Sequence, residues 1–93
     1  MPTRVVTIIN RKGLHARSAA KLVAVANQYD CQIELTCEGK NANCHSVMAL
    51  MMLAAGLGKE LHIATCGDNA DQALEAICSL IESGFEELDE DTP

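Results

Sequence analysis

Four stretches of the chain have the hydrophobic pattern of β-strands. Residues 4–10 are short, β-branched and followed by a turn, whereas residues 32–38 and 60–66 alternate polar with apolar side chains. Such alternation places one face of a strand in the core and the other in solvent. A turn at residues 38–40 leads to a short partner strand near 41–44. The pattern therefore predicts four strands, of which the second and third form a hairpin.

Three other stretches have the three- and four-residue apolar spacing of amphipathic helices. These helices are expected at residues 16 to about 29, 47–54 and 70–84. The third has the most regular stripe and ends at a glycine, as helices often do.

Capping residues support the start of two of these helices. Ser46 can accept a hydrogen bond from the first turn of the second helix, which Gly56 and Gly58 are expected to stop. Asn69 and Gln72 have the spacing of a capping box at the start of the third helix.

The predicted order is β-α-β-β-α-β-α, and each helix has an apolar stripe that needs a surface to cover. An antiparallel sheet can hold all three helices on one face while the other face stays in solvent. We therefore expect an α+β fold, an open-faced two-layer sandwich with a four-stranded antiparallel sheet and three helices on one face. The length of 93 residues fits one domain, placed at residues 1–85, with a mobile acidic tail at 86–93. The polar strand positions expected on the solvent face are Gln32, Glu34, Thr36, Glu60 and His62.

Composition and charge limit the classes of partner. Aromatic residues make up only 2% of the chain, so the stacking platforms of single-stranded nucleic-acid binders are missing. The formal net charge is -6, but residues 86–93 hold five of the 13 acidic residues. Near the start of the chain, four basic residues form a positive patch. This patch is too small for a nucleic-acid duplex and suits a phosphate group or an acidic protein, so we expect no nucleic-acid partner. The basic residues of this patch precede the first acidic residue, Asp30: Arg11, Lys12, Arg17 and Lys21.

The cysteines and the apolar runs bear on metal binding and location. Five cysteines without a Cys-x-x-Cys pair argue against a disulfide framework or a zinc site, and we expect no metal and no cofactor. The chain has no apolar signal core near its start and no apolar run near the ~20 residues that span a bilayer. The interpretation is a reduced, cytoplasmic protein without membrane insertion. It has no extensive self-complementary apolar surface, which predicts a monomer.

The candidate chemistry lies at the start of the first helix, in the segment Gly13-Leu14-His15-Ala16-Arg17-Ser18. The first N–H groups of a helix lack partners within the helix and carry the positive end of its dipole, so Ala16, Arg17 and Ser18 can bind a phosphate. The Arg17 side chain can add a charge-assisted hydrogen bond, and neutral His15 offers a lone pair that can accept a phosphoryl group. From these residues alone, a capping or surface histidine beside a solvated arginine is slightly favoured.

Longer segments around this motif resemble the HPr family, the histidine-containing phosphocarriers of the bacterial phosphotransferase system. The similarity comprises Asn-Arg-Lys-Gly-Leu-His-Ala-Arg-Ser-Ala-Ala at residues 10–20, Ser-Val-Met-Ala-Leu-Met-Met-Leu at 46–53, and the break at Gly67-Asp68 before the last helix. It covers nearly the whole chain. The segment 81–85 and the acidic end look more like the nitrogen-related branch, NPr, than the sugar-transport branch.

The resemblance implies a stoichiometric phosphocarrier, not a turnover enzyme. Enzyme I would transfer a phosphoryl group from phosphoenolpyruvate to Nδ1 of His15, and an enzyme IIA domain would receive it, in sugar uptake or nitrogen-related regulation. Arg17 matches the arginine that the family uses beside the phosphate. Ser18 stands where the family usually has proline, which suits a first helical turn because it has no N–H to satisfy. We expect transfer to survive, with a hydroxyl and an N–H beside the phosphoryl group changing its lifetime.

The resemblance also implies a regulatory site and a docking surface. Ser46 matches the serine that an HPr kinase phosphorylates in some family members, but His45 precedes it where many relatives have lysine, so we favour a simple helix cap. In the family this helix lies beside the histidine and forms part of the partner interface. We therefore expect Met48, Met51 and Met52 at that interface. The basic residues expected around this apolar centre are Arg11, Lys12, Arg17 and Lys21.

One alternative function belongs to a different class, a regulatory docking module that is never phosphorylated and uses the same apolar surface. The substitution His15→Ala separates the two, because a carrier loses its function whereas a docking module keeps its partner. A metallochaperone of similar element order would need a cysteine pair in the loop before the first helix, and that loop has no cysteine.

Overall fold

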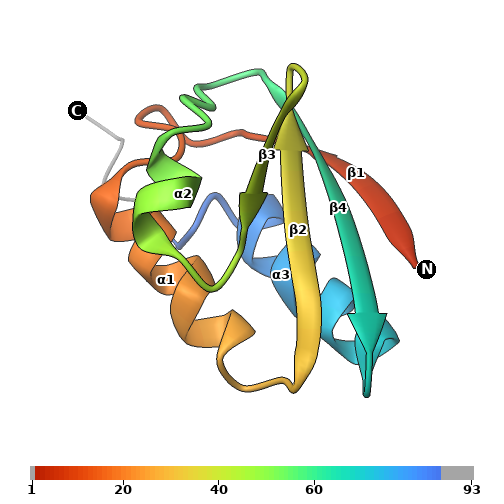
Figure 1. The fold of residues 1–93 in the computed structure, drawn as a ribbon. Coiled ribbons are helices and arrows are strands. Elements are labelled where there is room, and N and C mark those ends of the chain that lie inside the picture. Colours follow the sequence, from red (N-terminus) through yellow and green to blue (C-terminus); the bar gives the residue numbers. More distant parts are fainter. Residues whose placement is uncertain (1, 87–93) are drawn as a thin grey trace.

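The structure, a computed structural model, describes residues 2–86 and shows one sheet with helices on a single face (Figure 1). The predicted order of seven elements is confirmed. The strands are β1 (Thr3–Thr7), β2 (Cys31–Cys37), β3 (Lys40–Asn43) and β4 (Glu60–Gly67), and the helices are α1 (Ala16–Ala26), α2 (Val47–Met51) and α3 (Ala70–Glu82).

The sheet has the order β1-β4-β2-β3, and every neighbouring pair is antiparallel. Leu35 and Ile63 are opposite each other in the two central strands, and both face the helices. On the other face, Thr36 is opposite His62, and the predicted solvent face is confirmed because its polar side chains are exposed or half-buried. The open-faced two-layer sandwich is therefore confirmed.

The core between the two layers is almost entirely aliphatic. Leu35 and Leu61 of the sheet and Leu22 and Ile77 of the helices are all fully buried. Burial of each such side chain contributes roughly 1.5–3 kcal/mol to holding the two layers together. Phe85, just after α3, is also fully buried and extends this core to the end of the described chain.

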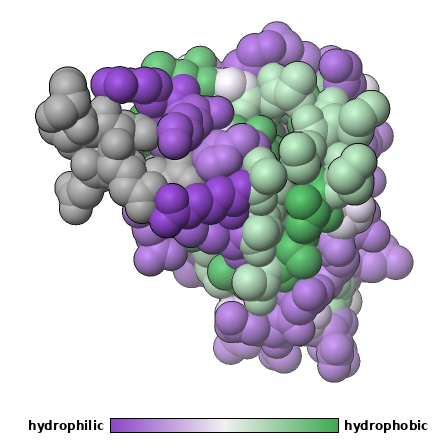
Figure 2. Space-filling view, turned by 90° about the vertical axis from the view of Figure 1, so that its left-hand side faces the viewer, coloured by the Kyte–Doolittle hydropathy of each residue, from purple (hydrophilic) through white to green (hydrophobic). Residues whose placement is uncertain are grey.

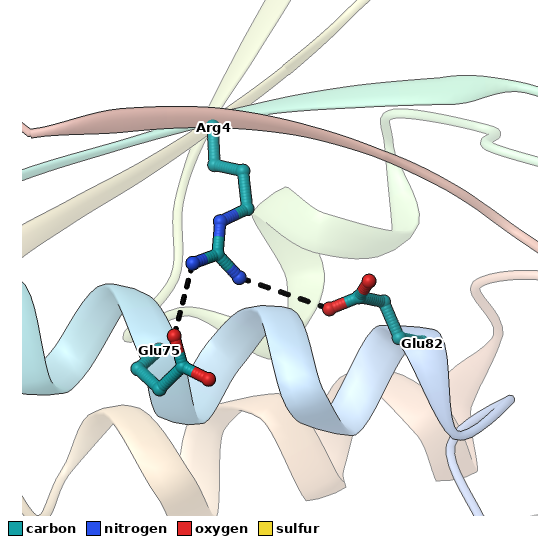
Figure 3. A network of polar contacts seen from close by, with 3 residues as sticks. All are labelled: Arg4, Glu75 and Glu82. Carbon is teal, nitrogen blue, oxygen red and sulfur yellow. Dashed lines mark hydrogen bonds and ion pairs between the residues drawn. The ribbon is translucent and has the colours of Figure 1, made fainter.

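An ion-pair network attaches the edge strand β1 to α3 (Figure 3). Arg4 reaches from β1 to the exposed side of the helix, where its Nη2 lies 2.9 Å from Glu75 Oε2 and its Nη1 lies 3.8 Å from Glu82 Oε1. The hydrogen bond to Glu75 is the main cause that raises the pKa of Arg4. These pairs are exposed and therefore add little to stability.

Some element boundaries differ from the prediction. β1 ends at Thr7, although Ile8 still bonds to the residues just before β4, donating to Lys59 O and accepting from Gly58 N. α1 ends at Ala26 with Asn27 as its C-cap, about three residues early. Such shifts arise where loop hydrogen bonds compete with a continued element.

The second and third helices differ more. α2 ends at Met51, well before the predicted stop at the glycines, and Ala54 has a left-handed φ of 52°. The predicted capping box at α3 is wrong, because Asn69 has a φ of 60° and makes no side-chain capping hydrogen bond. An N-cap side chain reaches the first turn from an extended backbone, which Asn69 does not have.

The ends of the chain complete the fold. Gly84, with a φ of 71°, follows α3 as predicted. Of the predicted acidic tail only Glu86 is described, and residues 87–93 lie outside the described residues. Within residues 2–86, no helix has both the length and the apolar character required to cross a membrane.

Candidate functional site

The loop that precedes α1 is fixed by Gly13. This residue has a φ of 66°, and a Cβ there would lie 2.6 Å from Ala55 O and 2.8 Å from the Cα of Gly56. Leu14 donates its N–H to Ala55 O at 2.8 Å, and the buried side chain of Asn10 donates to Gly13 O at 2.9 Å. Only glycine fits this close approach. The start of α1 is therefore held against the loop that follows α2.

His15 is the N-cap of α1, so the capping interpretation of this residue is confirmed. Its backbone is extended, with φ -128° and ψ -172°, and its ring is half-buried. Nδ1 accepts the backbone N–H of Arg17 at 3.3 Å, and the ring also accepts from the backbone of Ser18 in a capping box. Because Nδ1 needs a lone pair to accept, the neutral ring carries its proton on Nε2. The nitrogen that accepts these hydrogen bonds therefore faces the helix start.

Ser18 closes this capping box from within the protein. It is fully buried, and its Oγ accepts the backbone N–H of His15 at 2.8 Å. The same Oγ lies 3.0 Å from Gly13 O and 3.2 Å from His15 O, which are the acceptors for its proton. The hydroxyl is therefore already engaged within the protein, and its expected effect on the lifetime of the phosphoryl group stays a prediction. The serine hydroxyl fixes the backbone of the histidine.

The first turn of α1 has the electrostatics of an anion site. Ala16 and the Arg17 side chain are exposed, and the turn contains no acidic residue. The positive end of the helix dipole is thus not neutralised within the turn. The backbone N–H groups of Ala16, Arg17 and Ser18 belong to this helix start, and the assignment of these groups to phosphate binding stays a prediction.

An exposed apolar surface lies next to this helix start. Its members, called here the apolar patch, are Met48, Met51 and Met52 of α2 and its C-cap, exposed by 70%, 40% and 72%, and Leu57 in the following loop, exposed by 59%. α2 packs beside α1, and Figure 2 shows a continuous apolar area bordered by strongly hydrophilic residues. The sequence pattern missed Leu57, and the only signal was a lone leucine between two glycines.

Four basic residues, called here the basic rim, are Arg11, Lys12, Arg17 and Lys21. Arg11 and Lys12 are exposed in the turn that leads to Gly13. Lys21 is half-buried, and its Nζ donates to the carbonyl oxygen of Phe85 at 2.7 Å. This contact joins residues far apart in sequence, so the sequence pattern could not find it. Lys21 therefore has a structural partner as well as a predicted role in docking.

Ser46 and His45 occupy the other end of α2. Ser46 Oγ accepts the N–H of Ala49 at 3.2 Å, which confirms the predicted cap. The His45 ring lies 2.9 Å from Asn27 Oδ1 and 3.2 Å from Cys31 O, so it joins the loop before α2 to the end of α1 and the start of β2. His45 is thus a bridging residue between three segments of the chain.

The cysteines form no site in the structure. All five are free thiols, and only Cys66 is exposed. Burial raises the pKa of Cys44 to about 12, so this thiol stays protonated and unreactive at neutral pH. Within the described part of the chain, no group of three or more histidine, cysteine or acidic side chains is placed to hold a metal ion.

Comparison with known proteins identifies the family. A family model described as the PTS HPr component phosphorylation site matches residues 2–83. The chain belongs to the HPr family. An HPr phosphocarrier of Pseudomonas aeruginosa is 50% identical over 91 residues, which are 94% of this chain and 98% of that protein. An NPr phosphocarrier of Shewanella violacea is 44% identical, over 90% of this chain and 92% of its own.

Solved structures of HPr proteins have the same fold. The crystal structure of HPr-C-His from Thermoanaerobacter tengcongensis has a TM-score of 0.89 at 36% identity and covers 94% of this chain and 98% of its own. An HPr from Bacillus anthracis has a TM-score of 0.82 at 36% identity, over 86% and 95% of the two chains. Relatives with both names, HPr and NPr, match this chain over most of its length. The expectation that this chain belongs to the nitrogen-related branch rather than the sugar-transport branch therefore stays a prediction.

Proposed function

We propose that this HPr-family chain is a phosphoryl carrier that accepts a phosphoryl group on Nδ1 of His15 from Enzyme I and passes it to an enzyme IIA domain. The observation that carries the proposal is the orientation of the ring. As the N-cap of α1, His15 directs Nδ1 to the helix start, where it accepts the backbone N–H of Arg17 and where the helix dipole favours an anion.

The transfer needs few changes in the site. The Nδ1 lone pair forms the new N–P bond while the bond from phosphorus to the donor breaks, and the ring keeps its proton on Nε2. Once Nδ1 is bonded to phosphorus it can no longer accept from Arg17 N–H, at present 3.3 Å away. The phosphoryl oxygens then take the place of the ring as acceptors for this N–H and its neighbours. The helix start is capped before and after transfer, which keeps the reorganisation small.

The half-buried ring of His15, beside exposed Ala16 and Arg17, supports a protein partner, because large phosphoryl donors and acceptors must reach the same nitrogen in turn. The apolar patch supplies a small hydrophobic centre, and the basic rim attracts an acidic partner surface. Such a combination favours fast encounter and fast release. We expect Lys12→Glu to slow transfer strongly at low salt and only weakly at high salt. An unchanged rate at low salt would remove Lys12 from the interface.

Several further properties belong to this proposal. The chain acts as a stoichiometric intermediate, as a monomer, in the cytoplasm, where five free thiols are expected to stay reduced. Ser46 is a helix cap, and an HPr kinase is expected to leave it unmodified. If such a kinase and ATP phosphorylate the wild type but not Ser46→Ala, the cap is also a regulatory site.

The decisive test is intact-protein mass spectrometry after incubation with phosphoenolpyruvate, magnesium and Enzyme I of either branch. We expect one acid-labile phosphate on the wild type, none on His15→Ala, and one on the control His62→Ala, since His62 is exposed on the open face of the sheet. The faster Enzyme I would indicate the branch. No phosphate from either enzyme would refute the carrier role and favour the docking module that is never phosphorylated.

A further inference from the structure

The charges of this chain are strongly separated along the sequence. The basic rim lies in a segment that contains no acidic residue before Asp30. The last residues are the reverse, because Glu86, Glu87, Asp89, Glu90 and Asp91 follow one another with no basic residue among them. Two segments of opposite charge therefore occupy opposite ends of one short chain.

The fold brings these two ends together. After α3 the chain reverses direction, with Gly84 N–H bonded to Ile81 O and Phe85 N–H bonded to Leu80 O. Phe85 is fully buried, and its carbonyl oxygen accepts from Lys21 Nζ at 2.7 Å. The end of the described chain consequently meets α1, as the blue end of the ribbon in Figure 1 shows. The acidic segment begins at a member of the basic rim.

Arg17, a second member of the rim, is within reach of that starting point. Arg17 lies one helical turn before Lys21, a rise of about 6 Å along α1. An extended chain spans up to ~3.6 Å per residue, so the segment from Glu86 to Asp91 can reach about 20 Å. Tethering over such a short length gives an effective concentration in the millimolar range. Such tethering favours contacts that equally weak ion pairs would not hold between separate molecules.

We propose that the acidic segment, residues 86–93, docks on the basic rim and competes there with acidic partner proteins. A partner must displace the segment before it contacts the rim, which lowers the rate of association. The competition is electrostatic and exposed, so it weakens as salt screens the charges. Its consequence for phosphoryl transfer rests on the carrier function proposed above, whereas the docking contact itself does not.

The test compares two double variants with equal changes in net charge. Asp89→Asn/Asp91→Asn removes two charges from the segment, and Glu34→Gln/Glu60→Gln removes two from the open face of the sheet, where both side chains are exposed. Backbone amide shifts of residues 16–21 are recorded for both variants and for a chain that ends at Glu86, at low salt and at about 0.5 M NaCl. At low salt, we expect these amide shifts to differ from those of the wild type in the segment variant and in the shortened chain, but not in the open-face variant. Unchanged shifts in these two proteins would overturn the docking contact.

The kinetic readout is the rate of phosphorylation by Enzyme I. We expect the segment variant to react roughly two- to fivefold faster than the wild type at low salt, the range for one exposed ion pair, and equally fast at high salt. Equal acceleration of the open-face variant would show that net charge alone is responsible and would refute the competition. If no protein is phosphorylated, the carrier function fails, and the amide shifts still decide whether the segment docks.

Discussion

The close approach at Gly13 leads to a quantitative prediction for Gly13→Ala. An L side chain at a φ of 66° costs about 1–2 kcal/mol. The new Cβ would also lie 2.6 Å from Ala55 O and 2.8 Å from the Cα of Gly56, both backbone atoms that cannot rotate away. Such overpacking costs about 1–3 kcal/mol more. The expected loss of stability is about 2–5 kcal/mol, a large part of the 5–15 kcal/mol typical of a domain.

The matched control for this variant is Gly39→Ala. Gly39 lies in the β2–β3 hairpin with a φ of 82°, and a Cβ there would meet no atom within 4 Å. This variant therefore has the backbone strain without the clash, and its expected loss is about 1–2 kcal/mol. The difference between the two variants isolates the contact between Gly13 and the loop after α2.

Urea unfolding followed by circular dichroism measures both losses, with an unchanged slope as the check on two-state behaviour. Thermal unfolding gives a second measure, because each kcal/mol of lost stability lowers the Tm by about 4–8 °C. Gly13→Ala should also slow phosphoryl transfer, because the clash of the new Cβ is relieved only if His15 moves relative to the apolar patch. Gly39→Ala should leave the transfer rate unchanged. Equal losses of stability in the two variants would refute the reasoning.

Three further predictions concern other parts of the molecule. Ser18→Ala removes the capping-box hydroxyl and should cost about 0.5–2 kcal/mol in the same urea titration, and no loss would mean that the buried hydroxyl has no net value. At neutral pH one thiol, Cys66, should react rapidly with a thiol reagent and the buried four, including Cys44, slowly, and a second fast thiol would contradict the burial. Lys59 lowers the pKa of Glu38, so the pair stabilises the fold above the usual carboxyl range and stops doing so as the pH falls through that lowered pKa. The difference in Tm between the wild type and Glu38→Gln should therefore disappear in acid, and a constant difference would show that the ion pair is not its cause.

The sequence predicts best what depends on local periodicity. Leu35 and Ile63 belong to alternating strands, and their pairing across the sheet follows once both strands face the helices. His15 and Arg17 could be located because a glycine turn followed by an alanine-rich segment indicates a helix start. These features need only neighbouring residues, which is why their position was predictable.

Features that depend on distant segments were not predictable in this way. The inward orientation of Ser18 follows from the position of the Gly13 carbonyl, which the loop after α2 determines. Asn69 adopts a left-handed conformation because the chain must reverse between β4 and α3, and this removes the expected capping box. The bond from Lys21 to Phe85 spans 64 positions of sequence. Periodicity contains no information about such contacts.

The capping role of His15 links two equilibria that are usually considered separately. The ring that is proposed to receive the phosphoryl group also holds the first turn of α1, so phosphorylation and folding would share one set of hydrogen bonds. Around a thermodynamic cycle, any stability that the phosphoryl group adds to the fold must reduce the free energy released when the group leaves. The difference in unfolding free energy between the phosphorylated and unmodified protein thus measures how strongly the fold retains the phosphoryl group. An efficient carrier requires that difference to be small.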